Sequence, residues 1–303
     1  MNNHLCVTRA PLALCLAALL PLLGGCSTLR SDYHRPEAAL PAAWQQAASA
    51  PTPQSTEIWW QAFADPRLNA LIDEVLRQNA DLAVAGLKLR KARLQAKLTA
   101  TNQTPDLEVG ASHQVSAPLN GGDSARNYNT QASLSYELDL WGRLASSRDA
   151  ARWEAEATAQ DKAATALSLV GTTAALYWQI GYLNESLTLG EANLADTRRT
   201  LALATLKHQA GATDRLDLLQ AQQDLATQEA ALTQTRQQLI EQRNALALLF
   251  DAPPEQWRPH ELASLNDRVL PRVPAGLPAG LLARRPDLQA SEMRLRSTLA
   301  SGD

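Results

Sequence analysis

Residues 128–140 read Tyr-Asn-Thr-Gln-Ala-Ser-Leu-Ser-Tyr-Glu-Leu-Asp-Leu, and Trp141, Gly142 and Arg143 follow directly. Every second side chain is apolar or weakly polar, which predicts a strand with one apolar and one polar face, about as long as a tilted strand that crosses a bilayer. A lone strand would leave backbone groups unpaired in lipid, so it belongs either to a closed membrane barrel or, half-buried, to a soluble sheet. The candidate membrane residues are Tyr128, Leu134, Tyr136, Leu138, Leu140 and Trp141.

A weaker alternating stretch comes before this strand. Leu107, Val109 and Ala111 alternate with polar or small residues, and Val115 continues the pattern. The segment between the two stretches, 118–129, contains Asn-Gly-Gly-Asp at 120–123, which is typical of a turn. We therefore predict a β-hairpin with a polar loop at about 106–140.

Long helices account for most of the remaining sequence. Apolar residues at heptad-like spacing predict a helix that begins near Asp65-Pro66 and ends before Pro105. No proline interrupts Leu144 to Gln209, which allows a helix of roughly 100 Å. A leucine recurs every seven residues from Leu218 to Leu246, as in a left-handed coiled coil.

The break between these last two helices is short and consists of Ala210, Gly211, Ala212 and Thr213. A leucine zipper or a soluble helical bundle would also show the leucine repeat. A break this short instead favours an antiparallel helical hairpin at 144–250, because the chain has no room to place the second helix elsewhere. A proline-rich connector follows at 251–280.

The N-terminus carries a secretion leader at 1–25, with Arg9 before a short apolar run. Leu23-Gly24-Gly25-Cys26 resembles the lipobox of bacterial lipoproteins, in which the cysteine is acylated and becomes the new N-terminus. Cys26 is therefore the candidate lipidation site, and the alternative is an ordinary cleaved signal with an incidental cysteine. Residues 26–56 are rich in Pro and Ala and predict an extended tether.

Composition excludes several classes of function. A formal net charge of -3 gives no reason to expect a nucleic-acid partner. The histidines outside the leader are scattered without metal-ligand spacing, and no phosphate loop or nucleophile elbow is present, so we expect no metal, no cofactor and no enzyme activity. Asp214 and Asp217 lie three residues apart, which is more typical of a capping or solvated pair than of acid-base catalysis.

The C-terminal residues are similar to an earlier part of the chain. Residues 287–296 align with residues 81–90, matching Asp, Leu, a basic residue, Leu and Arg in register. This match predicts a first repeat at 57–250 and the start of a second repeat at 281–303.

Taken together, these features resemble the outer-membrane efflux family of TolC-like channels, and in particular its lipid-anchored branch. Residues 136–143 give the most specific match, a strand end that runs into a channel helix. Residues 32–36, 41–44 and 59–68 are similar to the family's tether and helix entry, 211–222 to its hairpin tip, and 277–288 to the opening of its second half. The fold class is then mainly α with a membrane β-hairpin.

The resemblance implies a homotrimer whose chains share one outer-membrane β-barrel, with long helices reaching into the periplasm. It also implies that the tip at 210–213 contacts a periplasmic membrane-fusion adaptor, which links the channel to an inner-membrane RND-type pump. Small molecules or drugs would pass through unchanged. Two strands per chain would give a trimer six, and such barrels begin at about eight, so we expect this chain to be a fragment that does not conduct alone.

The main alternative is a lipid-anchored periplasmic coiled-coil scaffold or adaptor without a pore. The two functions differ in their need for the hairpin, because a scaffold has no use for strands of bilayer length. The exported substrate, the particular adaptor and pump, and the regulation are not readable from the residues.

Overall fold

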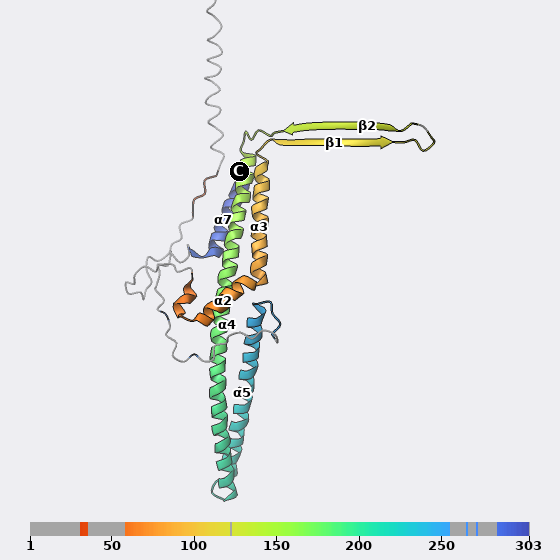
Figure 1. The fold of residues 1–303 in the computed structure, drawn as a ribbon. Helices are drawn as coiled ribbons and strands as arrows, with labels where there is room; N and C mark the ends of the chain where they lie inside the picture. Colours follow the sequence, from red (N-terminus) through yellow and green to blue (C-terminus); the bar gives the residue numbers. More distant parts are fainter. Residues whose placement is uncertain are drawn as a thin grey trace, which may run out of the picture. The chain divides into compact units, whose positions relative to one another are not determined.

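The computed structural model describes residues 31–35, 58–121, 123–254, 265, 271 and 284–302. The chain forms two compact units. The first comprises Met1–Ala39, Leu87–Asp161 and Arg285–Asp303, and the second comprises Leu40–Gly86 and Lys162–Arg284. Figure 1 shows the helices and strands of both units.

The first unit contains the β-hairpin and the helices next to it. It holds most of α3 (Ala80–Thr101), β1 (Asp106–Ser116), β2 (Ala125–Ser135), the beginning of α4 (Arg143–Gln209) and α7 (Pro286–Gly302). The two strands pair antiparallel from Asp106↔Ser135 to Ser116↔Ala125, so the predicted hairpin is confirmed.

The bounds predicted for the second strand are wrong at both ends. β2 begins at Ala125 rather than Tyr128, and it ends at Ser135 rather than Leu140. The pairing ends at Asp106↔Ser135, because the residue before Asp106 is Pro105, which has no amide hydrogen to donate to the ladder. The stretch after Ser135 instead caps α4, because the Asp139 carboxylate accepts hydrogen bonds from the Leu144 and Ala145 amides at 3.0 and 2.8 Å. Four of the candidate membrane residues therefore follow the strand: Tyr136, Leu138, Leu140 and Trp141.

The second unit contains the main apolar core. Its elements are η2 (Trp59–Phe63), α2 (Pro66–Gln78), the start of α3, the rest of α4 and α5 (Arg215–Leu248). Asp65 caps α2 by accepting hydrogen bonds from the Arg67 and Leu68 amides, as the Asp-Pro start predicted. The largest fully buried apolar side chains of this core are Leu68, Ile72, Val75, Tyr177, Ile180 and Leu246.

The single helix predicted between Asp65 and Pro105 is wrong, because it is two helices that meet at Asn79. The Asn79 amide closes α2 on the Val75 carbonyl at 2.9 Å, and its side-chain oxygen accepts from the Leu82 amide at 3.0 Å. The Asn79 side-chain amide also donates to the Leu249 carbonyl at 3.0 Å. This buried residue therefore ends one helix, caps the next and ties both to the end of α5.

The predicted helical hairpin of α4 and α5 is confirmed (Figure 1). Gly211 lies in the turn between the two helices and has φ +70. Leu232, Leu239 and Leu246 of the heptad series are buried. A Cβ added to Gly190 would lie 3.0 Å from Leu232 Cδ1, so this glycine allows the two helices to approach closely. Arg198–Glu229 and Arg236–Glu191 ion pairs at 3.0 and 2.9 Å cross the same pair of helices.

The helix starts agree with the register of the repeat. α3 begins one residue before Asp81, and α7 begins one residue before Asp287. Within the described residues, no helix combines the length and the apolar character that crossing a bilayer requires.

Candidate functional site: the β-hairpin and the helical tip

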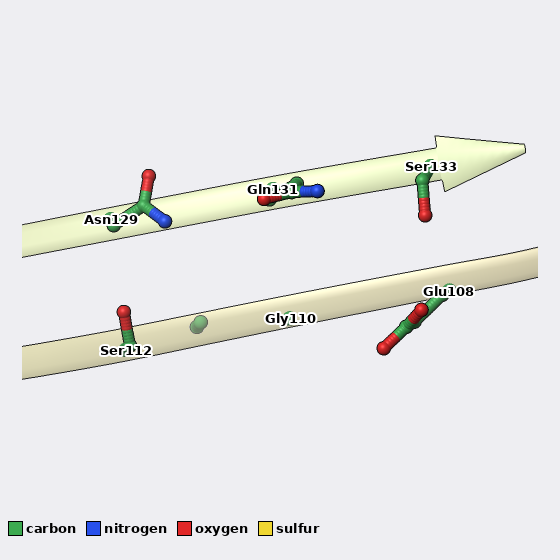
Figure 2. A pocket seen from close by; sticks show the side chains of 7 residues that line it. Glu108, Gly110, Ser112, Asn129, Gln131 and Ser133 are labelled. Atoms are coloured by element: carbon green, nitrogen blue, oxygen red, sulfur yellow. The ribbon is translucent and has the colours of Figure 1, made fainter.

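The two faces of the β-hairpin differ sharply in chemistry. One face is polar, and Figure 2 shows its side chains along a groove of about 220 Å³. Register places Glu108 opposite Ser133, Gly110 opposite Gln131, and Ser112 opposite Asn129 on this face. Such a surface suits contact with water or hydrophilic solutes.

The other face is apolar over most of its length. It pairs Leu107 with Leu134, Val109 with Ala132, and Ala111 with Thr130. Leu107, Val109 and Leu134 are 65%, 67% and 71% exposed, so nothing within the described chain covers them. A row of large exposed apolar side chains this long marks a surface that contacts lipid or protein.

Aromatic and charged groups stand at the loop end of this apolar face. His113 stacks on Tyr128 with ring centroids 4.5 Å apart, and Arg126 lies one pair further on, opposite Val115. Aromatic rings near the end of an apolar band and a charge at its edge are the arrangement found at a bilayer interface.

The junction between β2 and α4 is built by residues to which the sequence alone assigned no role. Gly142 adopts φ +80 and lets the chain turn into the helix, and Arg143 pairs with Glu137 at 2.6 Å. Desolvation raises the pKa of Asp139, but the amide hydrogen bonds from Leu144 and Ala145, with the charge of Arg143, outweigh it and lower the pKa below its usual value. An aspartate just before a helix start is a cap signal that could have revealed this junction.

The tip of the helical hairpin is closed by its own backbone. The Ala212 amide donates to the Lys207 carbonyl at 2.8 Å, and the Gly211 amide donates to the His208 carbonyl at 3.0 Å. With Gly211 at φ +70, this is a Schellman motif, which satisfies the last carbonyls of α4.

The next helix starts with equally local bonds. The Asp214 side chain accepts from the Asp217 amide at 3.0 Å, and the Thr213 hydroxyl donates to the Asp217 carboxylate. The Asp214–Asp217 pair therefore forms a helix cap, as the spacing predicted. A Cβ on Gly211 would meet nothing within 4 Å, so its surface is open.

The structure brings only some of the candidate residues together. Tyr128 and Leu134 lie in β2 of the first unit, and Ala210 to Thr213 form the tip in the second unit. Cys26 lies outside the described residues. Among the residues that the structure describes, no group of acidic, histidine or cysteine side chains could hold a metal ion.

Comparison with known proteins places this architecture in a family. The model of the outer membrane efflux protein family matches residues 71–250. The pyoverdine export outer membrane protein OpmQ of Pseudomonas putida is 33% identical over 303 residues, which cover 96% of this chain and 64% of OpmQ. The probable outer membrane lipoprotein SilC of Salmonella typhimurium is 27% identical, over 92% of this chain and 62% of SilC.

A solved structure of the outer-membrane channel OprN shares the fold, with a TM-score of 0.74 and 29% identity over 90% of this chain and 63% of OprN. The chain therefore belongs to the outer membrane efflux protein family. The predicted family, fold class and outer-membrane location are confirmed, and OpmQ and OprN are named as an export protein and a channel. The chain spans less than two thirds of the length of these relatives.

Proposed function

We infer that this protein is the outer-membrane channel component of a tripartite efflux pump and exports small molecules passively, without enzyme activity. The observation that carries this proposal is the hairpin, in which a polar row and a row that is apolar over most of its length run along both strands. An 11-residue strand tilted as in membrane barrels rises about 25 Å, which matches the apolar band of such a barrel. The apolar row would face lipid and the polar row a water-filled lumen.

Several further features support an assembly of this kind. Leu87, Leu94 and Leu98 form an exposed row on α3, at 64%, 56% and 62% exposure, which neighbouring chains of a homotrimer would cover. The proposed partners of the trimer are a periplasmic membrane-fusion adaptor and, through it, an inner-membrane RND-type pump. The name of the relative SilC as a probable lipoprotein supports acylation of Cys26.

Cysteine labelling should distinguish a channel from a scaffold. We expect a charged, membrane-impermeant thiol reagent to label Gln131→Cys at least about tenfold faster than Thr130→Cys, because a charge enters lipid only at a cost of several kcal/mol. The two positions are neighbours in β2 and lie on opposite faces. Equal labelling rates would place both faces in water and would favour the scaffold without a pore.

The tip should act as an adaptor contact in addition to being a helix cap. Gly211→Ala should destabilise the turn by about 1 kcal/mol, because alanine disfavours positive φ, whereas Gly211→Asn should keep the turn. If the open surface of Gly211 receives the adaptor, Gly211→Asn should also lose photo-cross-linking from position 212 to a membrane-fusion adaptor identified by mass spectrometry. Thermal unfolding is the control for folding. Unchanged cross-linking in a stable Gly211→Asn protein would leave the glycine as a cap only.

A further inference from the structure

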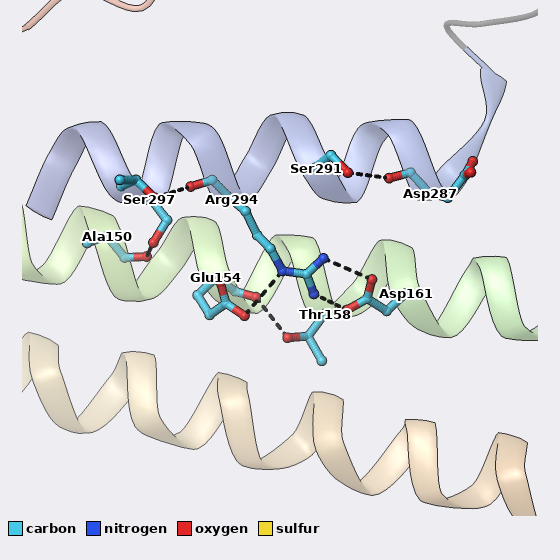
Figure 3. A network of polar contacts seen from close by, with 9 residues as sticks. Ala150, Glu154, Thr158, Asp161, Asp287, Ser291, Arg294 and Ser297 are labelled. Carbon is cyan, nitrogen blue, oxygen red and sulfur yellow. Dashed lines mark hydrogen bonds and ion pairs between the residues drawn. The ribbon is translucent and has the colours of Figure 1, made fainter.

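In the first unit, α7 is held along the beginning of α4 by polar contacts (Figure 3). Arg294 extends from α7 to Asp161 and to Glu154, the latter at 3.8 Å, and Ser297 donates to the Ala150 carbonyl at 2.9 Å. Hydrogen bonds to Asp161 raise the pKa of Arg294, so this cation stays charged. These contacts fix the side of α7 that faces α4.

A second arginine of α7 holds a different part of the chain. The Arg296 guanidinium lies 4.5 Å from the ring centroid of Tyr33 and 4.9 Å from that of Trp153. It therefore stands between one ring from the N-terminal segment and one from α4, and each contact has cation–π geometry. Its Nε atom is buried and has no hydrogen-bond partner within the described residues, while an NH2 group at the outer end of the guanidinium donates to the Glu292 carboxylate at 2.9 Å.

An ion-pair chain adds to this stack. Glu292 pairs with Arg35 at 2.9 Å and with Arg296 at 2.9 Å, and its side chain is only 14% exposed. Tyr33 and Arg35 thus both contact α7, Tyr33 through its half-buried ring and Arg35 through the ion pair of an otherwise exposed side chain.

We propose that Tyr33 and Arg35 are a clamp that fastens the lipid tether to the α4–α7 pair and so sets how far the acylated end can reach. This inference rests on the proposed acylation of Cys26. The N-terminal segment is then held as a strap at residues 31–35. We call the chain from Cys26 to Tyr33 the leash, because its length sets the largest distance that the acylated end can reach from the clamp.

The length of that leash matches the position of the clamp. Tyr33 lies seven residues after Cys26, which can span at most about 24 Å. Trp153 lies ten residues after Arg143, the first residue of α4, which is about 15 Å along the helix. The acylated cysteine can therefore reach the level at which strands become helices while Tyr33 stays in its clamp.

Protection of Tyr33 from chymotrypsin tests the clamp. Arg296→Ala should raise the rate of cleavage after Tyr33 about tenfold in the folded, membrane-bound protein. The substitution removes the cation–π contact that holds Tyr33, so the strap is open for a larger fraction of the time. Arg296→Lys should show a clear part of this effect, since it keeps the charge without the flat guanidinium. Arg285→Ala is the matched control, because within the described residues Arg285 forms its ion pair with Asp287 and makes no contact with the strap. Cleavage is quantified from the peptide that ends at Tyr33, and circular dichroism confirms folding.

A shortened leash tests the length argument. Deleting 27–30 keeps a serine after Cys26 and leaves about 10 Å of reach, which is less than the 15 Å required. We expect Tyr33 cleavage to rise in the acylated deletion protein and to stay low when the same deletion is secreted by an ordinary cleaved signal without the cysteine. Radiolabelled palmitate, lost in Cys26→Ser, reports the anchor separately.

The outcomes separate the two proposals. Equal protection of Tyr33 in the wild-type protein and in Arg296→Ala would overturn the clamp, whatever the palmitate result. An acylated deletion protein that keeps Tyr33 protected would overturn the length argument. Absence of palmitate from the wild-type protein, with the protection of Tyr33 intact, would instead remove the proposed lipid anchor.

Discussion

Thr130→Arg should abolish accumulation of the folded protein in the outer membrane. Thr130 is at the centre of β2, on the apolar face, opposite Ala111. If the hairpin spans the bilayer, this position lies near the midplane, where an arginine on the lipid face costs about 2–4 kcal/mol. The cost recurs in every chain of a shared barrel, so the amount of folded protein in the outer-membrane fraction should fall by more than tenfold.

Gln131→Arg is the matched control for this variant. It introduces the same side chain one residue away, on the polar face opposite Gly110, where no side chain competes for the space. We expect it to accumulate nearly as the wild-type protein does, and its lumenal charge to leave the fold unchanged. If both variants accumulate equally, the apolar face does not contact lipid, and the hairpin is not a membrane element.

The sequence predicted those parts of the fold that repeat along the chain. Alternation placed Leu107 and Leu134 on one face, and the paired register confirms this because side chains of a strand have a strict period of two. The leucine repeat likewise identified the seam in which Leu232 and Leu239 are buried. Both patterns are local and leave a periodic trace in the residues.

Single residues that cap a helix or bind a distant partner left no periodic trace of this kind. Asn79 divides a helix because it binds the carbonyl of Leu249, 170 positions away in the chain. Asp139 ends the strand pattern because its carboxylate caps α4, although Leu138 and Leu140 continue the alternation. The clamp joins Tyr33 to α7 across most of the chain.

The residues of the candidate sites also differ in whether the sequence alone revealed their roles. Gly211 was identified from the short break between two helices. A turn of so few residues requires a residue that tolerates positive φ, and Gly211 has φ +70. The residues that shape the strand–helix junction, Glu137, Gly142 and Arg143, belonged to the most specific family match but had no assigned role. Their roles depend on geometry between a strand end and a helix start.

Asp65→Ala should destabilise the second unit more than any surface substitution on α2. The Asp65 side chain is buried, caps α2 through the Arg67 and Leu68 amides, and accepts a 2.7 Å hydrogen bond from the Tyr177 hydroxyl of α4. Loss of the cap costs about 1 kcal/mol, and loss of a buried hydrogen bond to a charged group about 1.5–3 kcal/mol. We therefore expect unfolding by urea in detergent to show a loss of about 3 kcal/mol.

Two other substitutions make this result specific. Asp65→Asn keeps an oxygen for the cap and a polar group toward Tyr177, so it should lose much less stability than Asp65→Ala. Asp73→Ala removes an exposed carboxylate from the same helix and should change the unfolding free energy by less than about 0.5 kcal/mol. If Asp65→Ala and Asp73→Ala were equally mild, the bond between α2 and α4 would not stabilise the core. The packing of Leu68 and Ile72 against Tyr177 would then be sufficient to hold the two helices together.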